Sequence, residues 1–395
     1  MPDRRLYSLT PVGFRPCPLA GPEHPRYDRA LLMAALSRPA ALIPLVCWLG
    51  GTACAPTPDA NHDWPVYLGP GSSQYSPLDQ ISADNVEQLE VAWTYRAGGA
   101  DLENHRSQMQ TSPIVVDGVL YGVSPDTRVF ALDAATGERR WEFDPYAAGA
   151  ETRQGGNSRG VTYWSDGNEA RIFATGGAKL FALDASTGQP LASFGVGGSV
   201  DLHDDLEPER EIDDLFVISN TPGVIYEDLL ILPTRVAEGQ PAAPGHIRAF
   251  SVHTGEVVWR FRTIAHPGEA GYDTWPPDAW TRVGGANNWA GMSVDHDRGL
   301  VYVPTGSATP DFYGADRTGA NLFANTLLAL DAATGERRWH FQAVHHDIWD
   351  RDFPAPPNLL TIEQDGSRRD VVAQITKSAR RASKRASKVL IRLPC

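Results

Sequence analysis

Cysteine is scarce in this chain, and so is charge. The four cysteines are Cys17, Cys47, Cys54 and Cys395, so no cysteine lies between residues 54 and 395. A disulfide framework and a cysteine-based metal site are therefore excluded for the body of the chain. Charged residues make up 21% of the 395 residues, and the formal net charge is -13. This negative balance argues against binding to nucleic acid or to an anionic membrane surface.

The N-terminal region contains one short apolar run. Residues 40–50 are too few to span a bilayer but have the length of a secretion-signal core. Arg38 precedes the run, and Gly51-Thr-Ala-Cys54 follows it, which resembles a lipoprotein cleavage box with Cys54 as the lipid-bearing residue. An ordinary signal cleaved near Ala53 or Ala55 is the alternative. Because Met33 would give a more usual signal length, we expect residues 1–54 to combine a misassigned start with an export segment. The mature protein is then expected to be periplasmic, with a lipid anchor if Cys54 is modified.

Turn-forming residues are abundant. The chain contains 37 glycines and 31 prolines, and 42% of its residues are hydrophobic. That mixture favours many short strands joined by frequent turns over a helical fold, with enough apolar side chains for a sizeable core. The composition therefore predicts an all-β body.

One sequence unit occurs four times. Each copy begins with apolar residues and continues into a turn that contains Thr-Gly. In three of the four copies a Trp follows the turn. The copies are Phe130-Ala-Leu-Asp-Ala-Ala-Thr-Gly-Glu-Arg-Arg-Trp141, Phe181-Ala-Leu-Asp-Ala-Ser-Thr-Gly188, Ala249-Phe-Ser-Val-His-Thr-Gly-Glu-Val-Val-Trp259 and Leu328-Ala-Leu-Asp-Ala-Ala-Thr-Gly-Glu-Arg-Arg-Trp339. Such spacing is typical of propeller blades with insertions.

The unit has a structural interpretation. We expect a strand to end at Leu-Asp, a turn to use Gly for its positive φ and Asp or Thr to bond its backbone, and the Trp to pack between neighbouring sheets. Val91-Ala-Trp93-Thr-Tyr is interpreted as the closing strand of an earlier copy. A β-sandwich is the alternative, but it gives no reason for the repeated turn and Trp.

Several stretches together resemble the pyrroloquinoline quinone (PQQ)-dependent dehydrogenases, in particular the membrane-type glucose dehydrogenases. The resemblance runs from about Asp63 to Lys377 and includes Asp63-Trp-Pro-Val-Tyr-Leu-Gly and the Trp-bearing repeats. It implies a quinoprotein-type β-propeller of eight blades, about half of them encoded by residues 55–377. It also implies oxidation of an aldose, polyol or alcohol, with hydride passing to PQQ and electrons to ubiquinone or a cytochrome.

The resemblance also assigns catalytic residues. His345-His-Asp-Ile-Trp-Asp350 ends in the Asp that serves as general base in the family, and a carboxylate suits that task beside a cation. Lys377 stands where the family has a cation that contacts the quinone oxygens and stabilises developing negative charge. The alternative is that Asp350 caps a turn and Lys377 is solvated.

Further positions are implied as cofactor contacts. Trp289 matches the tryptophan on which PQQ stacks, and a flat polar ring system needs a rigid aromatic floor. Arg159 matches an arginine that binds a PQQ carboxylate. Gln110 and Thr221 match further polar contacts by alignment alone. A core role is the alternative for Trp289.

A divalent ion, usually Ca²⁺, is also implied. The family's ligands match Glu238, Asp350 and Ser307, although Ser307 replaces the usual Asn. Hard oxygen donors suit Ca²⁺. In alcohol-oxidising members of the family, an Asp at the position of Asp352 accompanies the use of lanthanides. Glucose-type members also have an Asp there, so Asp352 does not identify the metal. Adjacent cysteines are absent before Arg159, which favours the glucose-type branch, and Asp126 stands where some glucose enzymes have His.

The composition changes after Lys377. Residues 378–395 are basic, lack acidic residues and show no strand alternation, so we expect a frameshift near codon 378. A genuine basic tail is the alternative. With about half a ring of blades, the chain alone is expected to be inactive. A non-enzymatic propeller lipoprotein that acts as a scaffold in outer-membrane assembly is the alternative function.

Overall fold

The computed structural model describes residues 63–104, 107–150, 158–364, 366–377 and 388–392. Within these ranges the chain forms antiparallel sheets, and its helices are single 3₁₀ turns. These turns are η1 (Pro70–Ser72), η2 (Val86–Gln88), η3 (Tyr272–Thr274), η4 (Ala279–Thr281) and η5 (Ala315–Arg317). None of the described helices has the length and apolarity needed to cross a membrane. The prediction of an all-β fold is confirmed.

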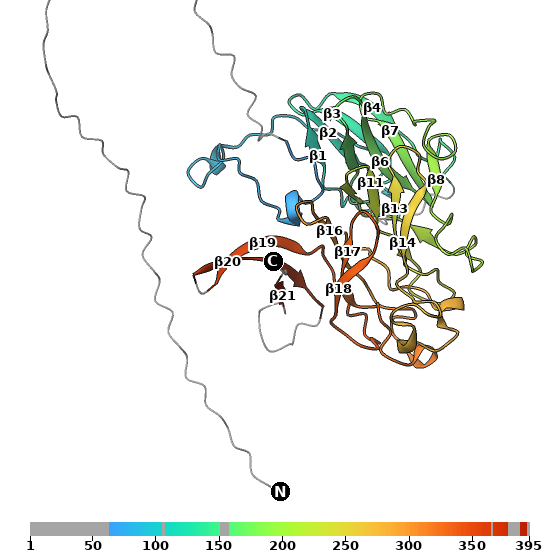
Figure 1. Ribbon diagram of the computed structural model, residues 1–395. Helices are drawn as coiled ribbons and strands as arrows, with labels where there is room; N and C mark the ends of the chain where they lie inside the picture. The colour runs from blue at the N-terminus through green and yellow to red at the C-terminus, as the bar shows by residue number, and fades with distance from the viewer. Residues whose placement is uncertain (1–62, 105–106, 151–157, 365, 378–387, 393–395) are drawn as a thin grey trace, which may run out of the picture. The chain divides into compact units, whose positions relative to one another are not determined.

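Four sheets have four strands each, and we call them the first to fourth blades (Figure 1). The first blade contains β1 (Ile114–Val116), β2 (Val119–Val123), β3 (Val129–Asp133) and β4 (Arg139–Phe143). The second contains β5 (Thr162–Ser165), β6 (Ala170–Gly176), β7 (Lys179–Asp184) and β8 (Ser199–Asp201). The third contains β10 (Val224–Tyr226), β11 (Leu229–Leu232), β13 (Ile247–Ser251) and β14 (Val257–Phe261). The fourth contains β15 (Ser293–Asp295), β16 (Leu300–Pro304), β17 (Thr326–Asp331) and β18 (Arg337–Gln342).

Two smaller sheets complete the described fold. β9 (Val217–Ile218), which precedes the third blade in the sequence, pairs with β12 (Arg235–Val236), which lies between that blade's strands β11 and β13. A fifth sheet has β19 (Asn358–Gln364), β20 (Ser367–Ile375) and β21 (Lys388–Arg392). β21 pairs with β20 across Val372 and Ile391. Residues 388–392 thus form a strand although residues 378–395 show no strand alternation, because β20 offers an edge to pair with.

The repeated turn forms as the sequence predicts. β3 ends at Asp133, whose Oδ1 accepts the backbone N–H groups of Ala135 and Thr136, each at 3.1 Å. Gly137 then takes φ 73°, a left-handed conformation that glycine adopts without strain. The chain re-enters the sheet in β4, which contains Trp141.

The predicted packing of Trp between neighbouring sheets is also confirmed. Trp141 donates its indole N–H to the carbonyl oxygen of Ala185, in the turn of the second blade, at 2.9 Å. A Cβ on Gly188 of that turn would lie 2.5 Å from the indole, so only glycine permits this approach. Trp259 makes the same bond, at 3.0 Å, to Ala332 of the fourth blade.

Two copies depart from the pattern. The second blade has Ala192 where a Trp would stand, and Phe194 and Val200 cover Gly255 of the third blade instead. Residues 91–95 were expected to form a strand but form none, although the indole of Trp93 still donates to the Ala134 oxygen at 3.1 Å. The side-chain contact is therefore kept without the strand pairing.

The predictions about the N-terminal export segment concern residues 1–54, which lie outside the described residues. All four cysteines, Cys54 among them, also lie outside. The domain boundaries at 54 and 377 remain predictions.

Candidate active site

A cavity of about 280 Å³ is lined by loops that join strands within blades and by loops that join successive blades. Each loop contributes polar or aromatic side chains. The lining includes six of the predicted site residues: Arg159 before β5, Glu238 after β12, Trp289 before β15, Ser307 after β16, Asp350 between β18 and β19, and Lys377 after β20. The propeller topology thus brings together residues that are far apart in the sequence.

Two cationic side chains lie close to the Trp289 ring. The guanidinium carbon of Arg159 and the Nζ of Lys377 each lie 5.6 Å from the centre of its ring. The indole N–H donates to Asp352 Oδ2 at 2.7 Å, which fixes the ring plane. A flat indole flanked by two cations is suited to bind a planar anionic molecule.

Thr221 supports this arrangement from behind. Its hydroxyl accepts a hydrogen bond from Arg159 Nη1 at 3.0 Å and donates to the Trp289 carbonyl oxygen at 2.7 Å. Thr221 is buried and does not line the cavity, so in this structure it positions Arg159 and Trp289.

Asp350 and Lys377 form an ion pair. Lys377 Nζ lies 3.0 Å from both carboxylate oxygens of Asp350 and 3.6 Å from Asp352 Oδ2. Burial raises the pKa of Asp350 above its ordinary value, although the hydrogen bond from Lys377 works in the opposite direction. Burial disfavours the charged form of Lys377, but Asp352 and Asp350 raise its pKa above the ordinary value. Lys377 is therefore a cation beside a carboxyl group whose pKa is raised.

Four carboxylates line this cavity. They are Glu238, Asp311, Asp350 and Asp352. Burial and the neighbouring carboxylates, Asp352 first among them, raise the pKa of Asp311 to about 7. So many oxygen donors around one cavity fit a hard divalent cation such as Ca²⁺, which would relieve their repulsion.

Asp311 and Asp352 have roles that sequence reasoning missed. Asp352 accepts the Ser307 backbone N–H at 2.6 Å as well as the indole N–H, so it connects two walls of the cavity. Ser307 directs its hydroxyl to Asp347 Oδ2, at 2.6 Å. Asp311 lies four residues after Ser307 in Thr-Gly-Ser-Ala-Thr-Pro-Asp, and its place near Thr305-Gly-Ser was the available signal.

Gln110, a predicted cofactor contact, and Asp126, noted as a departure from the family, also lie away from the cavity lining. Gln110 is exposed and bonds to Gln108 at 2.6 Å, because its segment runs over the surface. Asp126 accepts a hydrogen bond from Ser124 at 2.6 Å and pairs with Arg128 at 3.3 Å. Neither residue is part of the cavity lining.

The fold and the cavity define a class: a β-propeller with a pocket that contains an indole near two cations and a carboxylate–lysine pair. The family model for the PQQ glucose/ethanol/alcohol dehydrogenase β-propeller domain matches residues 64–380. The chain belongs to this family of PQQ-dependent quinoprotein dehydrogenases.

Relatives from several bacteria show the same similarity. The chain is 33% identical over 335 residues to quinoprotein glucose dehydrogenase of Escherichia coli (strain K12), covering 80% of this chain and 41% of that protein. It is 32% identical to the dehydrogenase subunit of alcohol dehydrogenase (quinone) of Gluconacetobacter polyoxogenes, covering 83% and 45%. The crystal structure of quinohemoprotein alcohol dehydrogenase from Comamonas testosteroni aligns with a TM-score of 0.66 and 27% identity, covering 80% and 46%. The chain thus spans less than half the length of these relatives.

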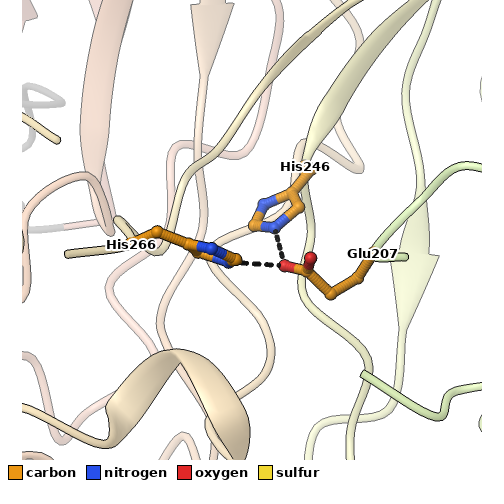
Figure 2. A group of neighbouring side chains, drawn as sticks. All are labelled: Glu207, His246 and His266. Carbon is orange, nitrogen blue, oxygen red and sulfur yellow. Dashed lines mark hydrogen bonds and ion pairs between the residues drawn. The ribbon is translucent and has the colours of Figure 1, made fainter. Parts of the chain in front are cut away.

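A second polar cluster lies outside this cavity. Glu207 Oε2 is 2.9 Å from His246 Nε2 and 2.9 Å from His266 Nε2 (Figure 2). All three side chains are buried or nearly so. Two imidazoles and a carboxylate this close together are also a possible zinc ligand set.

The hydrogen bonds of His246 favour a structural role instead. The Thr263 backbone N–H donates to His246 Nδ1 at 3.1 Å, so Nδ1 carries the lone pair and Nε2 carries the proton. A metal at Nε2 would have to displace that proton and leave an imidazolate, whereas the proton already bonds Glu207. We interpret the cluster as a hydrogen-bonded link between the segment before β9, the start of β13 and the loop after β14.

This link predicts a loss of stability in acid. Burial lowers the pKa of His246 to about 4, although the bond to Glu207 opposes the shift. As the pH falls, His246 takes up a proton in the unfolded chain before it does so in the folded chain. The folded state therefore has its full stability at neutral pH and loses on the order of 3 kcal/mol of it between about pH 6.5 and 4. Replacing His246 by Gln keeps a hydrogen-bond acceptor and a hydrogen-bond donor at this position but removes the titrating imidazole. Urea unfolding at about pH 6.5 and 4 should show that the free energy of unfolding depends less on pH in His246→Gln than in the native protein. An equal pH dependence in both proteins would contradict the structural role of His246.

Proposed function

We propose that this chain carries the cofactor site and the catalytic pair of a PQQ-dependent dehydrogenase for an aldose, a polyol or an alcohol. The observation that supports this most is the bidentate Asp350–Lys377 pair beside the Trp289 ring. Family membership supports the same chemistry.

Each site residue has a proposed role that follows from its chemistry. Trp289 provides the floor for PQQ, and Arg159 binds one of its carboxylates. When bound, PQQ supplies the hydride acceptor. Asp350 takes the substrate hydroxyl proton, and Lys377 keeps the carboxylate ionised while donating hydrogen bonds to an oxygen that gains negative charge.

A divalent ion completes the proposed site. Glu238 and Asp350 offer carboxylate oxygens from opposite loops of the cavity, and Asp311 lies near both. Ser307 contributes less, because its hydroxyl is already bonded to Asp347. Ca²⁺ is the proposed ion, with another divalent ion or a lanthanide as alternatives.

The function is tested by dye-linked oxidation of glucose and of ethanol after reconstitution with PQQ and Ca²⁺. The chain alone and a form with a full ring of blades, as in the relatives, are compared. We expect PQQ-dependent turnover in the full-ring form, little in the chain alone, and loss when Ca²⁺ is chelated. A full-ring form without PQQ-dependent turnover would reject the proposal. Electrons are proposed to leave to ubiquinone or a cytochrome, as the names of the relatives suggest.

The scaffold alternative is less well supported. A non-enzymatic propeller lipoprotein would need the docking turns but not the Asp350–Lys377 pair or the cation-flanked indole. Capture of outer-membrane assembly proteins without PQQ binding would favour it.

We propose a periplasmic location, with a lipid on Cys54. Replacing Cys54 by Ala should then move the protein from the membrane fraction to the soluble periplasmic fraction. Fractionation and immunoblotting would show this. Unchanged membrane association would mean that Cys54 is not the anchor.

A further inference from the structure

Asp347 is a buried acidic residue in the segment that carries Asp350. It is 3% exposed, whereas the other residues of 345–350 are exposed or half-buried. Burying a carboxylate is costly unless hydrogen bonds satisfy its oxygens. Asp347 does not line the cavity, and the proposed mechanism gives it no task. Its hydrogen bonds show what it does for its neighbours.

Two backbone amides donate to the Asp347 carboxylate. The N–H of Trp349 lies 3.1 Å from Oδ1, and the N–H of Arg351 lies 2.6 Å from Oδ2. These residues precede and follow Asp350, whose φ of 51° is a left-handed conformation that residues with a side chain seldom adopt. Strained backbone of this kind persists where the surrounding structure holds it in place. Asp347 therefore holds the chain on both sides of Asp350.

Ser307 anchors the same segment at both ends. Its hydroxyl donates to Asp347 Oδ2 at 2.6 Å, and its backbone N–H donates to Asp352 Oδ1 at 2.6 Å. Asp350 lies between these two anchored carboxylates, and Lys377 Nζ lies 3.0 Å from both of its oxygens. The backbone that carries Asp350 is thus fixed by bonds that Asp350 itself does not make.

A buried arginine fixes Asp347 in turn. Arg317 is 1% exposed, and it donates to the Asp347 carbonyl oxygen at 2.5 Å and to the Pro310 carbonyl oxygen at 3.0 Å. Pro310 directly precedes Asp311, another carboxylate of the cavity. One guanidinium therefore joins the loops that carry Asp311 and Asp350, and it restricts the movement of Asp347.

We propose that Asp347 is a positioning residue for the catalytic base, and that it holds the backbone of Asp350 so that the carboxylate faces Lys377 and the cavity. This role rests on the proposed function, because Asp347 acts on the reaction only through Asp350. Losing Asp347 should therefore affect turnover while Asp350 is present and have little effect once Asp350 is gone. A merely structural residue would lower turnover by the same factor in both cases.

Asp347→Asn tests this dependence in the full-ring form with PQQ and Ca²⁺. The amide has the same size but keeps only one acceptor oxygen, so the segment loses part of its anchoring. Turnover per PQQ-binding site should fall on the order of 10- to 100-fold, since a small misplacement of a catalytic group has effects of that size. In the Asp350→Asn background, the same substitution should change the residual turnover by less than about threefold.

Asp331→Asn is the matched control. Asp331 Oδ1 accepts the N–H groups of Ala333 and Thr334 at 3.1 and 3.0 Å in a turn of the same blade, outside the cavity lining. Its loss should lower the urea midpoint and leave turnover per site unchanged. Full turnover per site in Asp347→Asn, or the same fold loss in both backgrounds, would overturn the positioning role while the native full-ring form stays active. An inactive native full-ring form would reject the proposed function together with this inference.

Hydrogen exchange tests the contact without cofactor or substrate. In the 395-residue chain, the Trp349 and Arg351 amides should exchange at least about tenfold faster in Asp347→Asn than in the native protein, and Asp331→Asn should leave them unchanged. Asn325→Gly carries the test if Asp347→Asn does not fold. It removes a side-chain donor 3.1 Å from Asp347 Oδ2, and glycine adopts the φ of 47° there without strain. It should speed exchange at Arg351. Native exchange rates in the folded variants would overturn the proposal.

Discussion

Replacing Asp350 by Asn is expected to lower PQQ-dependent turnover by a factor on the order of 10²–10⁴, the usual effect of losing a general base. The amide can still accept a hydrogen bond from Lys377, which lies 3.0 Å from both oxygens in the native protein. It cannot take up the substrate proton. Steady-state dye reduction in a form with a full ring of blades measures the loss.

The control separates chemistry from folding. Asp297 is exposed and lies outside the cavity, so Asp297→Asn should retain full turnover. PQQ affinity of Asp350→Asn should stay close to that of the native protein, because Arg159 and Trp289 are unchanged. Full activity in Asp350→Asn would remove this carboxylate from the proposed mechanism.

Replacing Trp259 by Ala is expected to lower the free energy of unfolding by about 3–5 kcal/mol. The side chain is 7% exposed, packs on Gly335 of the next blade and donates to the Ala332 carbonyl. Its loss leaves a cavity between two sheets and an unbonded carbonyl. Urea unfolding followed by circular dichroism measures the change.

Trp259→Phe is the matched comparison. It keeps most of the apolar contact and removes only the N–H donor, so it should have a smaller effect of about 1–2 kcal/mol. A loss below about 1 kcal/mol for the Ala variant would mean that the docking contact contributes little to the packing of these blades.

The sequence predicted the repeating part of the fold because the relevant interactions are local. Asp133, Thr136 and Gly137 form their turn within five residues, so the pattern is visible in one stretch. The indole contact to the turn also repeats, at Trp93, Trp141 and Trp259. Residues 91–95 were misassigned because Trp93 keeps its contact while the backbone does not pair.

The site was predicted less completely, because its contacts join distant positions. Asp352 bonds to Trp289 across 63 residues, and no local pattern indicates that pairing. Glu207 bonds to His246 and His266 across 39 and 59 residues, so that cluster had no sequence signal either. Asp350, Lys377, Trp289 and Arg159 were found through the family resemblance, and the structure places them around one cavity.

A direct titration with PQQ tests whether Arg159, Trp289 and Lys377 form a PQQ site. PQQ is added to the 395-residue chain in the presence of Ca²⁺, and tryptophan fluorescence quenching and calorimetry are followed. The account predicts saturable binding at one site, weakened about 10- to 100-fold by Arg159→Ala, which removes a charge-assisted pair. Trp289→Ala should weaken it as well. Absence of saturable binding, or equal affinity in the native chain and both variants, would contradict the account.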